Sequence, residues 1–147
     1  ILGDDHPDTL TIKANLAGSL RALGDAAAAR TLQQEVLDAR RRILGDDHPE
    51  VLISMLNLSR VLIASGKRDE AETLLDDALG KARSSLPPVH PLLAAIGTAA
   101  GEIALAKGRR AEARSLFLQT RKIYEQMFEP GHERLVRIDE LLAKTQP

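Results

Sequence analysis

Four histidines are the residues whose type and spacing in this sequence could support chemistry. The run LGDDHP occurs twice, ending in His6-Pro7 and in His48-Pro49, and further histidines stand at positions 90 and 132. Two carboxylates followed by an imidazole could form half of a metal site or part of a catalytic loop. The same run could instead mark the boundary of a repeat. The three interpretations predict different proteins.

The spacing of the histidines favours the repeat. They follow one another at a constant interval of 42 residues, and glycines at 24, 66 and 108 keep the same step. The third copy, LPPVHP, keeps His90 but has Pro88 and Val89 in place of both carboxylates. Zinc ligands lie about 2.1 Å from one ion, whereas residues one repeat apart are separated by at least a helix spacing of about 8–10 Å. We therefore expect helix-junction histidines, no metal and no cofactor.

Composition and charge exclude several classes of function. The chain has 147 residues, 44% of them hydrophobic and 28% charged, with a formal net charge of -1. Nucleic-acid binding needs a basic face, and membrane spanning needs an apolar run of about 20 residues; neither is present in the sequence. The absence of cysteine excludes disulfides and fits a reducing, cytoplasmic setting. No phosphate loop or Ser-His-Asp order is found, so we expect no enzyme.

Each period divides into two helical segments. Apolar residues recur at three- and four-residue steps in both halves, and the glycine between them is expected to end the first helix with a positive φ. Proline at a first helical position has a preset φ and no N–H to leave unpaired. The small-residue run IGTAAG, from Ile96 to Gly101, is expected to let a neighbouring helix approach closely. The predicted helices cover residues 8–23, 26–43, 51–65, 68–83, 91–107, 109–128 and 132–144.

Two stretches in register resemble tetratricopeptide repeats (TPRs) of the 42-residue type seen in kinesin light chains. They are NLAGSLRALGDAAAARTLQQEVL (residues 15–37) and NLSRVLIASGKRDEAETLLDDAL (residues 57–79). The small residue after Asn-Leu, the glycine, the Glu-Ala pairs at 70 and 112 and the His-Pro junction all recur in register. The third repeat departs from the pattern, with Ala99 and Ala100 in place of Asn-Leu.

The resemblance implies an all-α fold, a right-handed α-solenoid of three TPR helical hairpins plus a C-terminal capping helix. The repeats would cover about residues 7–48, 49–90 and 91–131, and the capping helix about residues 132–145. We expect a single TPR domain over residues 1–147 that belongs to a larger protein.

The same resemblance implies a scaffold that binds a peptide or partner segment in a concave groove. By register, the asparagines that hold peptide backbone in such grooves match Asn15 and Asn57, whereas the third repeat has Ala99. The expected peptide-binding residues are Asn15, Gly18, Arg21, Ile53, Leu56, Asn57, Arg60, Thr98 and Glu102.

Two other interpretations stay open at this point. The chain could form a homo-oligomer, or it could be an intramolecular regulatory module of a larger multidomain signalling protein. The asparagines could hydrogen-bond only to a neighbouring helix, and the arginines could be only solvated. Neither nucleic acid nor membrane is expected as a partner.

Overall fold

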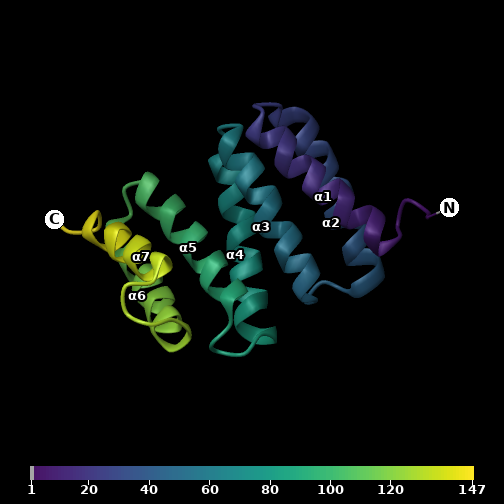
Figure 1. The fold of residues 1–147 in the computed structure, drawn as a ribbon. Coiled ribbons are helices and arrows are strands. Elements are labelled where there is room, and N and C mark those ends of the chain that lie inside the picture. The colour runs from purple at the N-terminus through teal and green to yellow at the C-terminus, as the bar shows by residue number, and fades with distance from the viewer. Residues whose placement is uncertain (1) are drawn as a thin grey trace. The chain divides into compact units, whose positions relative to one another are not determined.

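Seven helices and no strand make up residues 2–147, the part of the chain described by this computed structural model. Ile1, which the predicted domain includes, lies outside the described residues. Every predicted helix is present with its ends within two residues, which confirms the all-α class. In chain order the helices are α1 (Pro7–Ala22), α2 (Ala26–Leu44), α3 (Pro49–Ala64), α4 (Arg68–Ser85), α5 (Pro91–Ala106), α6 (Arg110–Met127) and α7 (Glu133–Ala143) (Figure 1).

The chain divides into two compact units, Ile1–Leu74 and Leu75–Pro147, with the boundary inside α4. In the first unit α2 packs against both α1 and α3 (Figure 1). In the second unit α6 packs against both α5 and α7. Consecutive helices therefore pair as hairpins within each unit, as the 42-residue period predicts.

A glycine with positive φ ends the first helix of each hairpin. The φ angles of Gly24, Gly66 and Gly108 are 90°, 74° and 77°. A side chain with a Cβ is strained in this region, whereas glycine is not. At the end of α3 the backbone N–H of Lys67 donates to the carbonyl oxygen of Leu62 at 2.8 Å, which satisfies one of the last helical carbonyls. The predicted turn is confirmed at all three positions.

Each of the four histidines caps the N-terminus of a helix. Nδ1 of His6, His48, His90 and His132 accepts a hydrogen bond from the backbone N–H two residues later, at 3.0–3.2 Å. At α1, α3 and α5 a proline follows the histidine as the first helical residue. The capping hydrogen bond needs only the histidine, and the first helical turn needs only the proline. The third copy, LPPVHP, therefore keeps its N-cap although it lacks both carboxylates of the LGDDHP run.

Apolar and small residues form the core of the second unit. The Phe117 ring of α6 is fully buried and packs in a cluster with Tyr124, Leu135 and Ile138. A Cβ at Gly97 would lie 2.8 Å from Oγ1 of Thr120, and one at Gly101 would lie 2.4 Å from the Phe117 ring. The glycines thus let α5 and α6 approach closely, which confirms the prediction for IGTAAG.

The core of the first unit contains polar side chains as well as apolar ones. Leu10, Val36 and Ala39 form one small apolar cluster between α1 and α2. Next to it on α2 the buried guanidinium of Arg40 donates to Oγ of Ser54 at 2.8 Å and pairs with the Glu50 carboxylate at 3.1 Å. A buried charge needs such partners, and these link α2 to α3.

The described residues offer neither a metal centre nor a membrane helix. No group of three or more His, Cys, Asp or Glu side chains in residues 2–147 could hold a metal ion. No helix in the same range is long and apolar enough to cross a bilayer.

Candidate functional site

A depression of about 430 Å³ lies on the first unit between α1 and α3. Five of the nine predicted peptide-binding residues line it: Asn15, Gly18, Arg21, Asn57 and Arg60. The other lining residues are Ala14, Ser19, Ala22, Gln33 and Val61. The structure therefore brings together at one surface five residues that the sequence had connected only by their register.

Helix geometry explains why these residues meet. Asn15 and Gly18 are three apart on α1, and Asn57 and Arg60 are three apart on α3, so each pair shares one helix face. The two faces line the same depression, with α2 packed against both helices. A Cβ at Gly18 would meet no atom within 4 Å, so this glycine keeps the depression open.

The two asparagine amides are available for a ligand. Within residues 2–147 neither the Asn15 nor the Asn57 side chain hydrogen-bonds to another protein group. Asn15 is exposed and Asn57 is half-buried. A side-chain amide carries both a donor and an acceptor, which is the pairing that an extended peptide backbone presents. In the described residues, therefore, neither asparagine side chain hydrogen-bonds to a neighbouring helix, which was the alternative interpretation.

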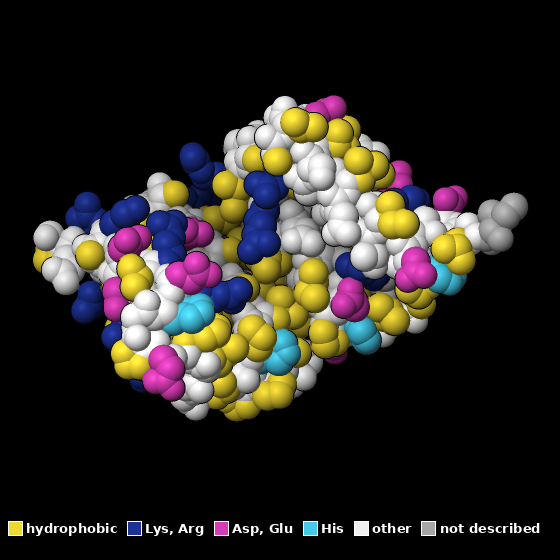
Figure 2. Space-filling model, in the orientation of Figure 1, with side chains coloured by type: hydrophobic (Ala, Val, Ile, Leu, Met, Phe, Trp, Pro, Cys, Tyr) yellow, Lys and Arg dark blue, Asp and Glu magenta, His cyan; other side chains and the backbone are white. Residues whose placement is uncertain are grey.

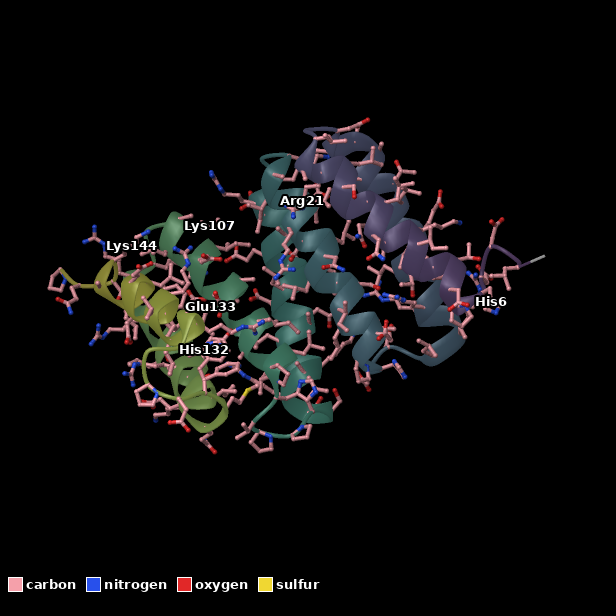
Figure 3. The ribbon with its side chains drawn as sticks, viewed as in Figure 1. His6, Arg21, Lys107, His132, Glu133 and Lys144 are labelled. Carbon is pink, nitrogen blue, oxygen red and sulfur yellow. The ribbon has the colours of Figure 1, made fainter. Side chains whose placement is uncertain are left out.

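The charge at this surface is basic. Arg21 and Arg60 are exposed, and no Asp or Glu in the described part of the chain lines the depression. Figure 2 shows Lys and Arg side chains beside a hollow over α1 and α3, and Figure 3 labels Arg21 on the side of α1 that faces α3. Two exposed guanidinium groups favour a carboxylate or phosphate partner.

None of the five other lining residues was among the nine predicted ones, and one of them, Gln33, comes from α2. Its side chain is only 2% exposed, and its Nε2 donates to the carbonyl oxygen of Ala14 at 3.2 Å. The register carried a signal that could have found it, because positions 75 and 117 in the next two periods hold Leu75 and Phe117, both fully buried. A glutamine at an otherwise apolar position is unexpected in a core.

The remaining predicted residues do not line this depression. Ile53 is half-buried, and Leu56 is 4% exposed, so a ligand could touch Leu56 only at its edge. In the second unit Thr98 lines a separate depression of about 280 Å³ together with Tyr124 and residues of α7. Glu102 forms an ion pair with Arg137 at 2.9 Å.

Comparison with known proteins assigns the family. Two family models, each described as tetratricopeptide repeat, match residues 8–84 and 98–134, and the first alone covers just over half of the chain. The chain belongs to the tetratricopeptide repeat family. None of the curated proteins compared with this TPR chain matches it.

Solved structures similar to this TPR chain are kinesin-light-chain-like. Two crystal structures of a kinesin-light-chain-like protein of Podosopora anserina, with nearly identical TPR-like repeats, have TM-scores of 0.89 and 0.88 at 23% and 26% sequence identity. The alignments cover 99% and 95% of this chain and 68% and 66% of those chains. BtubC (BKLC) of P. vanneervenii has a TM-score of 0.81 at 16% identity, with 93% of this chain and 55% of that chain covered.

These likenesses establish the fold. The chain spans about two thirds of the Podosopora anserina chains and about half of BtubC. TPR domains generally act as protein–protein interaction modules and are typically non-catalytic.

Proposed function

We propose that this TPR chain is a non-enzymatic interaction domain that binds an extended peptide segment of a partner protein between α1 and α3. The observation that carries the proposal is that Asn15, Asn57, Arg21 and Arg60 line one depression around the open surface of Gly18. In this proposal the asparagines hydrogen-bond the peptide backbone and set its register. The arginines attract acidic side chains of the segment.

The proposed ligand site belongs to a single TPR domain within a larger, cytoplasmic protein. The repeats at about residues 7–48, 49–90 and 91–131 and the capping segment at about 132–145 remain the proposed organisation. Ile53 and Leu56 in the first unit, and Thr98 and Glu102 in the second, stay proposed peptide-contact residues of their own units. The half-exposed surfaces of Ile53 and Thr98 are compatible with that role.

Selection of random linear peptides on the purified chain tests the proposal. We expect enrichment of peptides that contain acidic residues. The double variant Asn15→Ala, Asn57→Ala should lose most of the enriched pool, because a buried peptide group left without a partner costs about 1–3 kcal/mol. Gln126→Ala removes an amide from α6 that does not line the depression and serves as the control. Unchanged binding by a folded double variant would refute the proposal.

A second candidate function is self-association through α1. Ile12 and Leu16 on this helix are 64% and 50% exposed, and Leu23, its C-cap residue, is 84% exposed. One period later Ser54 and Leu58 occupy the positions of Ile12 and Leu16 and are buried on α3, which α2 packs against. An uncovered apolar face of this kind favours a second copy of the chain as its partner.

Light scattering over a concentration series separates the two candidates. A stable dimer that dissociates in the variant Leu16→Glu would support self-association. A chain that is monomeric at all concentrations and still enriches peptides would refute self-association and support the peptide-binding function.

A further inference from the structure

Gln33 occupies a core position at which the other two periods have only apolar side chains. Leu75 and Phe117 lie one and two periods later and are fully buried, whereas Gln33 is 2% exposed. The chain buries an apolar side chain at the equivalent position of both other periods, so an apolar residue would also be expected at position 33. The glutamine therefore needs an explanation that packing does not supply.

Half of the Gln33 amide is left without a partner. Nε2 donates to the carbonyl oxygen of Ala14 at 3.2 Å, while Oε1 is buried and hydrogen-bonds to no group in residues 2–147. The amide cannot be reversed, because Oε1 and the Ala14 oxygen are both acceptors and would repel each other. The free acceptor is consequently a fixed feature of this side chain.

The unsatisfied oxygen belongs to a residue of the proposed peptide site. Gln33 lines the depression from α2, together with Asn15 and Gly18 of α1 and Asn57 of α3. Asn15 is exposed, and a Cβ at Gly18 would meet no atom within 4 Å, so the depression is open on the side of α1. The donor has to reach the bottom of the depression to meet Gln33.

We propose that Gln33 is the floor of the peptide site and that its Oε1 accepts a hydrogen bond from a backbone N–H of the bound segment. The inference rests on the proposed peptide-binding function and adds to it the deepest contact. In an extended segment the N–H groups of alternate residues point to the same side, so one such group can be directed at Gln33. A proline at that position of the segment would lack the donor and bind poorly.

If Gln33 has this role, its unpaired Oε1 should lower the stability of the free protein. A buried acceptor without a partner destabilises the unliganded fold, and binding removes the penalty. A side chain retained only for packing would show the opposite behaviour, since its replacement would destabilise the fold and leave binding unchanged. The two roles can therefore be distinguished by measuring stability and binding on the same variant.

The test uses Gln33→Met, which keeps the length of the side chain and removes its polar atoms. The probe is the peptide pool enriched on the wild-type chain. We expect a higher melting temperature and a loss of affinity of about tenfold or more, the factor that corresponds to one unsatisfied hydrogen bond. Gln34→Met is the matched control, because Gln34 is the exposed neighbour whose Nε2 donates to Asp38. That variant should bind the pool as the wild type does.

The possible outcomes separate this inference from the proposed function. If the wild type enriches peptides and Gln33→Met binds them equally well, the inference fails and the proposed function stands. If the wild type enriches no peptide, both fail. If Gln33→Met does not fold, NMR of the wild type decides: the Gln33 side-chain amide resonances must shift when the best enriched peptide is added, and unmoved resonances overturn the inference.

Discussion

The Phe117 ring on α6 lies so close to Gly101 on α5 that a Cβ at residue 101 would be 2.4 Å from the ring atom Cε1. Both residues are buried, and Phe117 is part of the apolar cluster of the second unit. The glycine is thus required by the close approach of two helices, since it lies inside α5 and not at a turn. Its cost in helix propensity is offset by the packing of a large aromatic ring.

Gly101→Ala should therefore destabilise the protein. A glycine-to-alanine change inside a helix ordinarily gains about 0.5–1 kcal/mol. Here the added methyl group overpacks the core, and we expect a net loss of about 1–3 kcal/mol in the free energy of unfolding. Urea denaturation measures the difference.

Gly80→Ala is the matched control for this prediction. Gly80 lies inside α4, and a Cβ there would meet nothing within 4 Å. The control should gain up to about 1 kcal/mol from helix propensity alone. If the two variants changed stability by the same amount, the close packing of Gly101 against Phe117 would be contradicted.

His48→Ala should destabilise the helix that His48 caps. Nδ1 of His48 accepts the backbone N–H of Glu50 at 3.1 Å, and alanine offers no acceptor. Loss of an N-cap typically costs about 1 kcal/mol. His48→Asn supplies an oxygen at the same place and should retain most of the stability.

Chemical denaturation of the two His48 variants checks the cap, and equal losses in both would argue against it. Nitrogen NMR of the wild type offers an independent reading. Because Nδ1 accepts a hydrogen bond, the neutral imidazole of His48 must carry its proton on Nε2. Observation of the other tautomer would exclude the bond.

The elements of this fold could be predicted because their signals are local and repeated. Gly24, Gly66 and Gly108 recur at one interval and adopt positive φ in the structure. The histidines recur at the same interval and cap helices. The turn glycine and the capping histidine act on residues next to them in sequence, so each gives the same local structure in every repeat.

The site was predicted in part, because register places a residue on a face without saying how deeply it is buried. Asn15 and Asn57 were found together at one depression, but Leu56 from the same predicted set is buried. Gln33 was missed because it lies on α2, whereas the family resemblance points to the first helix of each repeat. Packing of α2 beneath α1 and α3 brings it to the site, and that depends on tertiary structure.

Asp76→Asn should stabilise the protein slightly at neutral pH. The pKa of the Asp76 carboxyl is raised above its ordinary value of 3.8 by partial burial and by the nearby charge of Glu112, while Lys107 lowers it. The charged form is therefore disfavoured in the folded state. Because the side chain is exposed and screened by solvent, we expect a gain of at most about 0.5 kcal/mol.

The pH dependence of the Asp76 effect has a definite sign. Between pH 3.8 and the higher pKa of the folded state, the folded protein binds more protons at Asp76 than the unfolded chain does. Its stability then falls as the pH rises through this window, so the advantage of Asp76→Asn should grow over the same range and level off above it. Urea denaturation across a pH series measures the trend, with Asp77→Asn as the neighbouring control. A variant less stable than the wild type at neutral pH would contradict the assignment.

Arg21 should contribute to peptide binding through a term that salt weakens. It stands exposed beside Asn15 and Gly18 in a depression that no acidic residue of the described chain lines. Exposed charges are screened over about 8–10 Å at ordinary ionic strength. For acidic peptides enriched on the wild type, Arg21→Ala should lower affinity by about 0.2–1 kcal/mol at low salt and by less at high salt.

Fluorescence titration of one such acidic peptide over a series of salt concentrations measures this contribution, and two further variants locate it. Lys122→Ala removes the same charge from an exposed position on α6 and should leave the salt dependence unchanged if the effect is local to the depression. Gly18→Gln fills the open space between the asparagines, so it should weaken binding at every salt concentration because the obstruction is steric. If Arg21→Ala and Lys122→Ala altered the salt dependence equally, the net charge of the protein would account for the attraction of the acidic peptide. A local contribution of Arg21 to the site would then be contradicted.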